Sequence, residues 1–241
     1  MNNLIIPDWP APAGVHALVT TRQGGVSTGP WTGFNLAAHV GDDATAVTAN
    51  RALLRQSLPA EPPWLTQVHG TLCVDAAKAQ SGVEADASCA RQRGVVCAVL
   101  TADCLPVLLC DDKASVVSAV HAGWRGLADG VIEASVAAMR LPGERLMAWL
   151  GPAIGPMAFE VGADVRDAFL ARDAQAAQAF TPLSEGKWLC NIYQLAHQRL
   201  NALNIHRIAS ADFCTVRDID RFYSFRRDGV TGRMASCIWL E

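Results

Sequence analysis

The sequence predicts an α+β fold or a layered α/β/β/α arrangement rather than a doubly wound sheet. Three observations predict it. The chain of 241 residues is 51% hydrophobic and 18% charged, which is enough apolar material for a large core. Short Val- and Leu-rich segments are interspersed with amphipathic ones, and the two kinds do not alternate in a regular βαβ rhythm. No linker-like run is visible, so we expect one domain over residues 1–241.

The N-terminal part predicts a strand, a loop and a helix. Residues 15–21 alternate in polarity as a half-buried strand does. Residues 22–33 are rich in Gly and Ser and too long for a hairpin turn, which favours a functional loop. Asp42 and Asp43 are suitable caps for a helix whose apolar positions lead to the breaker Pro59.

The rest of the chain predicts a central sheet with helices around it. Short apolar segments indicate strands at residues 64–69, 71–75, 95–100, 106–110, 115–121, 147–150, 207–211 and 233–240. Apolar residues at helical spacing predict helices at 127–140, 162–171 and 191–203.

Composition excludes several classes of protein. The formal charge of −3 does not suggest a nucleic-acid binder, and no apolar run approaches the roughly 20 residues that cross a bilayer. The first residues carry no secretory signal, so we expect a cytoplasmic protein without a membrane or nucleic-acid partner. The basic residues are mostly Arg, which suits bidentate recognition of phosphate or carboxylate.

Two imidazoles and a thiol follow apolar segments, in Gln67-Val68-His69, Asp103-Cys104 and His121-Ala122-Gly123. The eight cysteines should stay reduced and mostly buried. Two imidazoles and a thiolate are a competent ligand set for zinc and leave a fourth position open. From the residues alone, hydrogen-bonded core histidines or a Cys104–His121 nucleophile and base with Asp103 as orienting carboxylate remain alternatives.

Residues 15–240 contain a series of motifs that occur in the same order as in one protein family. They are TTRQGGVS, FNLAAHVGDD followed by Asn50-Arg51, WLTQVHG, TADCLPVLL, HAGWRG, GPAIGP and YSFRRDGVTGRMASCIWL. Together they resemble the YfiH-type laccase-domain family, formerly labelled multicopper polyphenol oxidases and described as purine nucleoside phosphorylases and adenosine deaminases. The resemblance implies a single layered α/β/β/α domain with mixed central sheets.

The resemblance also implies a zinc site with His69, Cys104 and His121 as ligands, copper being the less favoured metal. The implied activities are phosphorolysis of adenosine, inosine, guanosine and S-methyl-5′-thioadenosine to free base and (methylthio)ribose 1-phosphate, and hydrolytic deamination of adenosine to inosine. Purine nucleosides and orthophosphate are then the partners of the chain. We expect a monomer or a weak homodimer.

Catalytic roles are assigned to Cys104, His121 and Asp103, with Asp86 as a second carboxylate for proton transfer. Phosphorolysis needs anion donors, which Arg22 supplies with the amides of Gly24 and Gly25. Further residues assigned to substrate or phosphate are Asn35, Arg51, Gln67 and Arg227, with Arg226 as an additional donor. Trp124 is suited to stacking on a purine or to packing on the sheet.

Two other functions stay open at this stage. One is a cysteine hydrolase or amidase that acts on a cell-wall precursor through Cys104. The other is copper-dependent polyphenol oxidation. One three-ligand site and six histidines are fewer ligands than a blue-copper centre with a trinuclear copper cluster needs.

Overall fold

The computed structural model describes residues 4–210 and 212–241. In these ranges the largest sheet has six strands in the order β12-β8-β6-β7-β4-β3. It is mixed, because β12/β8 and β3/β4 pair in parallel and the other neighbours are antiparallel. Its strands are β3 (Cys73–Asp75), β4 (Ala87–Ala90), β6 (Leu105–Asp111), β7 (Val117–Ala122), β8 (Leu146–Leu150) and β12 (Arg207–Ser210).

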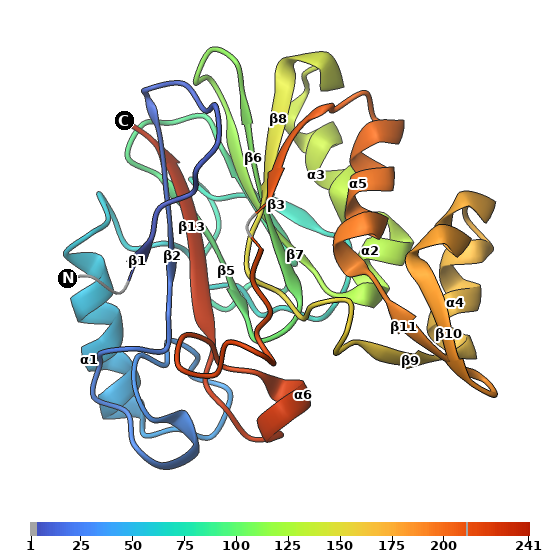
Figure 1. Ribbon diagram of the computed structural model, residues 1–241. Coiled ribbons are helices and arrows are strands. Elements are labelled where there is room, and N and C mark those ends of the chain that lie inside the picture. Colours follow the sequence, from blue (N-terminus) through green and yellow to red (C-terminus); the bar gives the residue numbers. More distant parts are fainter. Residues whose placement is uncertain (1–3, 211) are drawn as a thin grey trace.

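A second, antiparallel sheet lies face to face with the first (Figure 1). Its order is β1-β2-β13-β5, with β1 (Leu4–Ile5), β2 (Val15–Thr20), β5 (Val96–Thr101) and β13 (Met234–Leu240). One buried cluster joins Val99 and Ile238 of this sheet to Leu108, Val117 and Trp149 of the other. The strands β5, β6 and β7 are buried along their whole length, which explains their continuous apolar sequences.

Helices cover the outer faces of both sheets (Figure 1). Leu54 of α1 (Ala44–Arg55) packs with Leu18 and Leu100 of the four-stranded sheet. The six-stranded sheet is covered by α2 (Trp124–Asp129), α3 (Val131–Met139) and α5 (Ile192–Ala202). The layers therefore run helix, sheet, sheet, helix, and the predicted α+β class with layered mixed sheets is confirmed.

A third sheet was not predicted. It has the order β10-β11-β9 in the described part of the chain and packs with α4 (Ala163–Leu170). Its strands are short and mostly exposed, so they carry a weak hydrophobic signal. Their bounds are β9 (Glu160–Gly162), β10 (Phe180–Ser184) and β11 (Lys187–Cys190). The remaining elements are α6 (Phe225–Asp228), η1 (Gly29–Trp31), η2 (Gly143–Arg145) and η3 (Ala174–Ala179).

The N-terminal helix forms where the sequence predicts it, because Asp43 accepts a hydrogen bond from the Thr45 amide at the helix start. Asn191 caps α5 in the same way through the Gln194 amide. The predicted strands at 95–100, 106–110, 115–121, 147–150 and 233–240 are found with small shifts of their ends. The strand predicted at 207–211 is β12, and Ala211 lies outside the described residues.

Three local predictions are wrong. Residues 64–69 form no strand and make only an isolated bridge between Thr66 and Glu84. The helix predicted at 127–140 begins earlier, at Trp124, and is broken at Gly130, whose φ of 105° interrupts the helical backbone. The predicted strand at 71–75 shortens to β3, while β4 was missed. No helix among the described residues is long and apolar enough to span a membrane.

Candidate metal centre

His69, Cys104 and His121 come together from three separate segments. His121 lies near the end of β7, Cys104 in the turn between β5 and β6, and His69 in the loop before β3. One ligand atom from each residue lies within 4.8 Å of the others, and the Cys104 Sγ to His69 Nε2 distance is 3.7 Å. That spacing suits a zinc ion with metal–ligand bonds of about 2.0–2.3 Å. These are the ligands that the sequence analysis selected.

Asp86 organises two of the three ligands. Its Oδ1 lies 2.8 Å from His121 Nδ1, which leaves Nε2 of that ring for a metal. The same carboxylate accepts hydrogen bonds from the backbone amides of Val68, His69 and Gly70 at 3.2, 2.9 and 2.7 Å. These bonds hold the loop in which His69 adopts a φ of 60°, so Asp86 fixes both histidines.

The thiol and the imidazole of the cluster perturb each other. Burial raises the pKa of the Cys104 thiol, but the charge of His121 and hydrogen bonds from both imidazoles outweigh it and lower that pKa to about 6. Burial lowers the pKa of His121, whereas the charge of Cys104 and the bond to Asp86 raise it to about 9. At neutral pH the metal-free site is therefore a thiolate beside an imidazolium.

Gly123 makes room for the cluster. A Cβ at this position would lie 2.5 Å from Cδ2 of His69 and 3.2 Å from Sγ of Cys104. Its φ of −65° is open to any residue, so space rather than backbone conformation requires glycine here. The glycine is also the N-cap of the following helix, α2.

A cavity of about 130 Å³ opens beside Cys104. Its wall includes the turn residues Ala102, Asp103 and Cys104, and its other lining residues are Trp124, Ile154, Phe159, Ile192, Phe225 and Arg226. Sequence analysis missed Phe159, Ile154, Ile192 and Phe225, because a single apolar side chain in a loop or helix gives no signal of cavity lining.

Asp103 ties the Cys104 turn to the C-terminal segment. One carboxylate oxygen accepts a hydrogen bond from the Thr215 hydroxyl, and the other accepts one from the Arg226 amide at 2.7 Å. Its φ of 92° is unusual for a residue other than glycine, and the two bonds offset the strain of that conformation. Asp103 thus lies next to a metal ligand and on the cavity wall.

Arg51 lies on α1 and is held in place by its surroundings. Its Nε donates to the Leu36 carbonyl at 2.9 Å, and its guanidinium lies 4.4 Å from the centre of the Trp64 ring. Burial lowers the pKa of Arg51, with Glu61 opposing the shift. The Leu36 amide in turn donates to the carbonyl of Arg233, a residue whose role the sequence analysis did not address.

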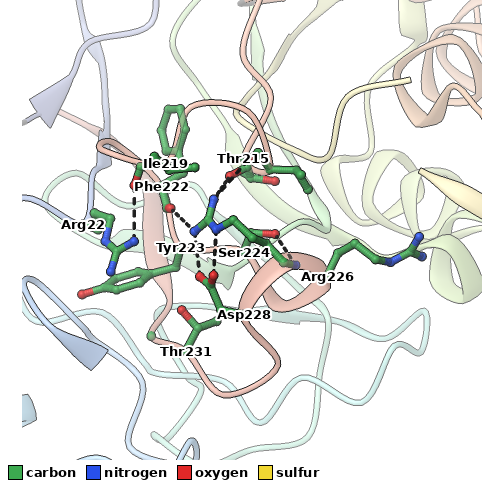
Figure 2. A network of polar contacts seen from close by, with 12 residues as sticks. Arg22, Thr215, Ile219, Phe222, Tyr223, Ser224, Arg226, Asp228 and Thr231 are labelled. Carbon is green, nitrogen blue, oxygen red and sulfur yellow. Dashed lines mark hydrogen bonds and ion pairs between the residues drawn. The ribbon is translucent and has the colours of Figure 1, made fainter. Parts of the chain in front are cut away.

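Arg22 and Arg227 both line a larger hollow of about 750 Å³ together with Gly24, Gly25 and Asp228. Arg22 donates to the Ile219 carbonyl at 3.3 Å and lies over the Tyr223 ring (Figure 2). Arg227 donates to the Thr215, Val216 and Phe222 carbonyls and to the Asp228 carboxylate. Gly24 and Gly25 have φ values of 82° and 71°, a left-handed backbone that glycine adopts without steric cost.

The two amide side chains assigned to substrate are bonded to protein groups. Gln67 makes two hydrogen bonds of 2.7 Å with the backbone of Leu100, which attach the His69 loop to β5. Asn35 is fully buried and bonded to Ala37, Asp42 and the Arg233 amide. The structure therefore gathers the three candidate ligands, Asp86 and Asp103 around one site. Gln67 lies on the His69 loop but is bonded to Leu100, and Arg22, Asn35, Arg51 and Arg227 lie on other segments.

Comparison with known proteins gives one family. A purine nucleoside phosphorylase of Pseudomonas aeruginosa is 52% identical over 242 residues and covers 100% of both chains. The Escherichia coli purine nucleoside phosphorylase YfiH is 49% identical over 243 residues with the same coverage. Among crystal structures, a Neisseria meningitidis protein has a TM-score of 0.96 at 49% identity and 100% coverage of both chains. YlmD from Geobacillus stearothermophilus has a TM-score of 0.90 at 28% identity, with coverage of 100% and 97%.

The family model described as multi-copper polyphenol oxidoreductase laccase matches residues 16–241. The resemblance predicted from the motifs is confirmed, and the chain belongs to this laccase-domain family, whose relatives above include proteins named purine nucleoside phosphorylase.

Proposed function

We propose that this protein is a zinc-dependent purine nucleoside phosphorylase. Its proposed substrates are adenosine, inosine, guanosine and S-methyl-5′-thioadenosine, which it cleaves with orthophosphate to free base and (methylthio)ribose 1-phosphate. It also deaminates adenosine to inosine in this proposal. The observation that carries the proposal is the convergence of His69, Cys104 and His121 within 4.8 Å in a chain about half identical to named purine nucleoside phosphorylases.

The donor set favours zinc. Two imidazoles and a thiolate suit this borderline-soft ion, and three protein ligands leave one coordination position for water or substrate. When bound, zinc supplies Lewis acidity and lowers the pKa of a water molecule. Asp86 keeps the His121 ring in the orientation that presents Nε2, because it holds Nδ1 at 2.8 Å.

The protein's own residues have to hold an anion and manage a proton. In phosphorolysis an orthophosphate oxygen forms a bond to C1′ while the bond from C1′ to the purine nitrogen breaks and its electrons leave with the base. We assign the anion to arginine side chains, Arg51 or Arg22 with the Gly24 and Gly25 amides. We assign to Asp103 the transfer of a proton to the base, and its position on the wall of the cavity beside Cys104 supports this assignment.

Product analysis tests the proposal. Metal-loaded protein is incubated with each nucleoside with and without phosphate, and the products are separated by chromatography. Free base that forms only with phosphate, and inosine that forms from adenosine without it, are the expected results. The His121→Ala protein should form neither. A native protein that leaves all four nucleosides intact would overturn the proposal.

One observation favours a second function, a cysteine hydrolase or amidase acting on a cell-wall precursor. Cys104, with its pKa lowered to about 6, lies beside His121, which Asp86 orients, and such a trio can activate a nucleophile. A trapped acyl-thioester on Cys104, detected by mass spectrometry, would support this function. Retention of the metal by the two imidazoles during turnover would count against it.

The description of the matching family raises a third function, copper-dependent phenol oxidation. Among the described residues only one group of His, Cys and acidic side chains has ligand spacing, whereas a blue-copper centre with a further copper cluster needs more ligands. Copper content and absorbance of the purified protein decide this point.

A further inference from the structure

We propose that the cavity beside Cys104 is the subsite for the purine base and that Phe225 is the aromatic side chain on which the base stacks. This inference rests on the proposed nucleoside phosphorylase activity and assigns one part of its substrate to one surface. The cavity has a volume of about 130 Å³. An engineered protein cavity of roughly 150 Å³ accepts benzene, so the space suits about one ring of a purine, and the second ring would lie at the open mouth of the cavity.

The lining of the cavity selects among the parts of the substrate. Six of its side chains are apolar, from Ala102, Trp124, Ile154, Phe159, Ile192 and Phe225. A ribose in such a cavity would lose the hydration of its hydroxyl groups without replacement. Orthophosphate would meet mostly apolar walls and the Asp103 carboxylate, which repels an anion, with Arg226 as the one cation among the lining residues. A heteroaromatic base is the part of the substrate that this surface can bury at the least cost.

The three aromatic residues of the cavity differ in how free their rings are. Trp124 has the Arg125 guanidinium 4.5 Å from its ring centre and packs on the main core. Phe159 is 8% exposed and has the Arg226 guanidinium 5.4 Å from its ring centre. Phe225 has the Arg233 guanidinium 5.8 Å from its ring centre, but it is 58% exposed although it lines the cavity. An exposed ring at the mouth of an apolar cavity can stack on a base without a change in the core.

Arg226 supplies polar recognition at the same rim. Its side chain extends away from the network formed by the neighbouring residues (Figure 2), and its Nη1 donates to the Glu160 carbonyl at 2.9 Å. The other guanidinium donors make no recorded hydrogen bond within residues 4–210 and 212–241 and can meet the acceptor nitrogens or carbonyl of a purine. Its backbone amide bonds to Asp103, so the rim is fixed relative to the Cys104 turn.

This placement sets the base beside the metal ligands, since Cys104 itself is part of the cavity wall. The base enters next to the cluster, and the sugar and phosphate remain outside the apolar lining. The other apolar part of a substrate, the methylthio group of S-methyl-5′-thioadenosine, is the competing occupant that the experiment has to exclude.

The test is the binding of free adenine to the metal-loaded protein, measured by titration calorimetry and as product inhibition. Phe225→Ala should weaken adenine binding about tenfold, the range of one base–aromatic stack, and raise the KM for adenosine similarly. The KM for phosphate should not change. Phe225→Tyr should restore adenine binding because it keeps the ring. Val230→Ala is the matched control, since Val230 is similarly exposed at 56% and lies outside the cavity lining.

Unchanged adenine binding by Phe225→Ala would overturn the subsite. A selective loss for S-methyl-5′-thioadenosine over adenosine would also overturn it, by placing the methylthio group in the cavity. If the native protein consumes no nucleoside, the proposed function fails, whereas the calorimetric comparison of native protein and Phe225→Ala still judges the subsite separately.

Discussion

Asp86 Oδ1 lies 2.8 Å from His121 Nδ1, and both residues are buried, with exposed fractions of 0% and 3%. The same carboxylate holds three consecutive amides of the loop that carries His69. One buried charge thus sets the tautomer of one ligand and the backbone position of another. The geometry of the candidate metal site depends on this residue, although it is not one of the three candidate ligands.

Replacement of Asp86 should therefore weaken metal binding. We expect Asp86→Asn to lower zinc affinity about 10- to 100-fold, the usual cost of losing a partner behind a metal ligand, in competition with a chelator. Asp111→Asn is the matched control. Asp111 is also 0% exposed and also accepts several backbone and hydroxyl hydrogen bonds, but it lies at the end of β6 away from Cys104. Equal loss of zinc affinity in both variants would show that the effect is general destabilisation.

Metal binding should release a proton at neutral pH. The pKa of Cys104 is about 6, so the thiolate is already formed at pH 7.5. The pKa of His121 is about 9, so this ring must lose a proton to bind a metal. Zinc affinity should rise about tenfold per pH unit between pH 7 and the pKa of His121, and level off above it. Calorimetry in buffers of different ionisation enthalpy measures the released proton, and zero release at pH 7.5 would contradict the thiolate–imidazolium pair.

A methyl group at Gly123 should disrupt the cluster. The added Cβ would come within 2.5 Å of His69 Cδ2, so we expect Gly123→Ala to purify with much less zinc. Gly70→Ala is the control in the same neighbourhood, because its Cβ would meet Asp86 Oδ2 and Val68 only at an ordinary 3.5 Å. Zinc content is measured by atomic emission, and full zinc content in Gly123→Ala would contradict the described packing.

Arg51 should affect phosphate more than nucleoside. Loss of its half-buried charge in Arg51→Gln is expected to raise the KM for phosphate at least about tenfold, as removal of one charged hydrogen bond does, with a smaller change in the KM for nucleoside. Arg55→Gln is the control one turn along α1, where the guanidinium donates to the carbonyls of Leu58 and Pro59. An identical phosphate KM in native protein and Arg51→Gln would remove Arg51 from the proposal and leave Arg22.

The parts of the fold that the sequence predicts are those with a strong local signal. Strands such as β5 and β6 are buried throughout, and the capping residue Asp43 marks the start of α1. The exposed β10 and the bridge at Thr66 have no such signal, because tertiary contacts alone define them.

The candidate ligands were predicted through the family motifs, because from the residues alone core histidines or a nucleophile and base remained alternatives. The way they are held was not predicted. Asp86 was considered for proton transfer, and its contacts with three amides depend on a loop that the sequence analysis interpreted as a strand. Phe225 belongs to a helix of four residues, too short to show a periodic face, so its place at the cavity appears only in three dimensions.

The most direct test of a metal-dependent nucleoside phosphorylase is a comparison of native protein, Cys104→Ala and Cys110→Ala. Cys110 is a fully buried thiol at the far end of β6 from Cys104, so it controls for the loss of a sulfur atom. Zinc content and phosphate-dependent formation of hypoxanthine from inosine are measured on each. We predict about one zinc ion and phosphorolysis in native protein and Cys110→Ala, and neither in Cys104→Ala. Full phosphorolysis by zinc-free Cys104→Ala would contradict the account.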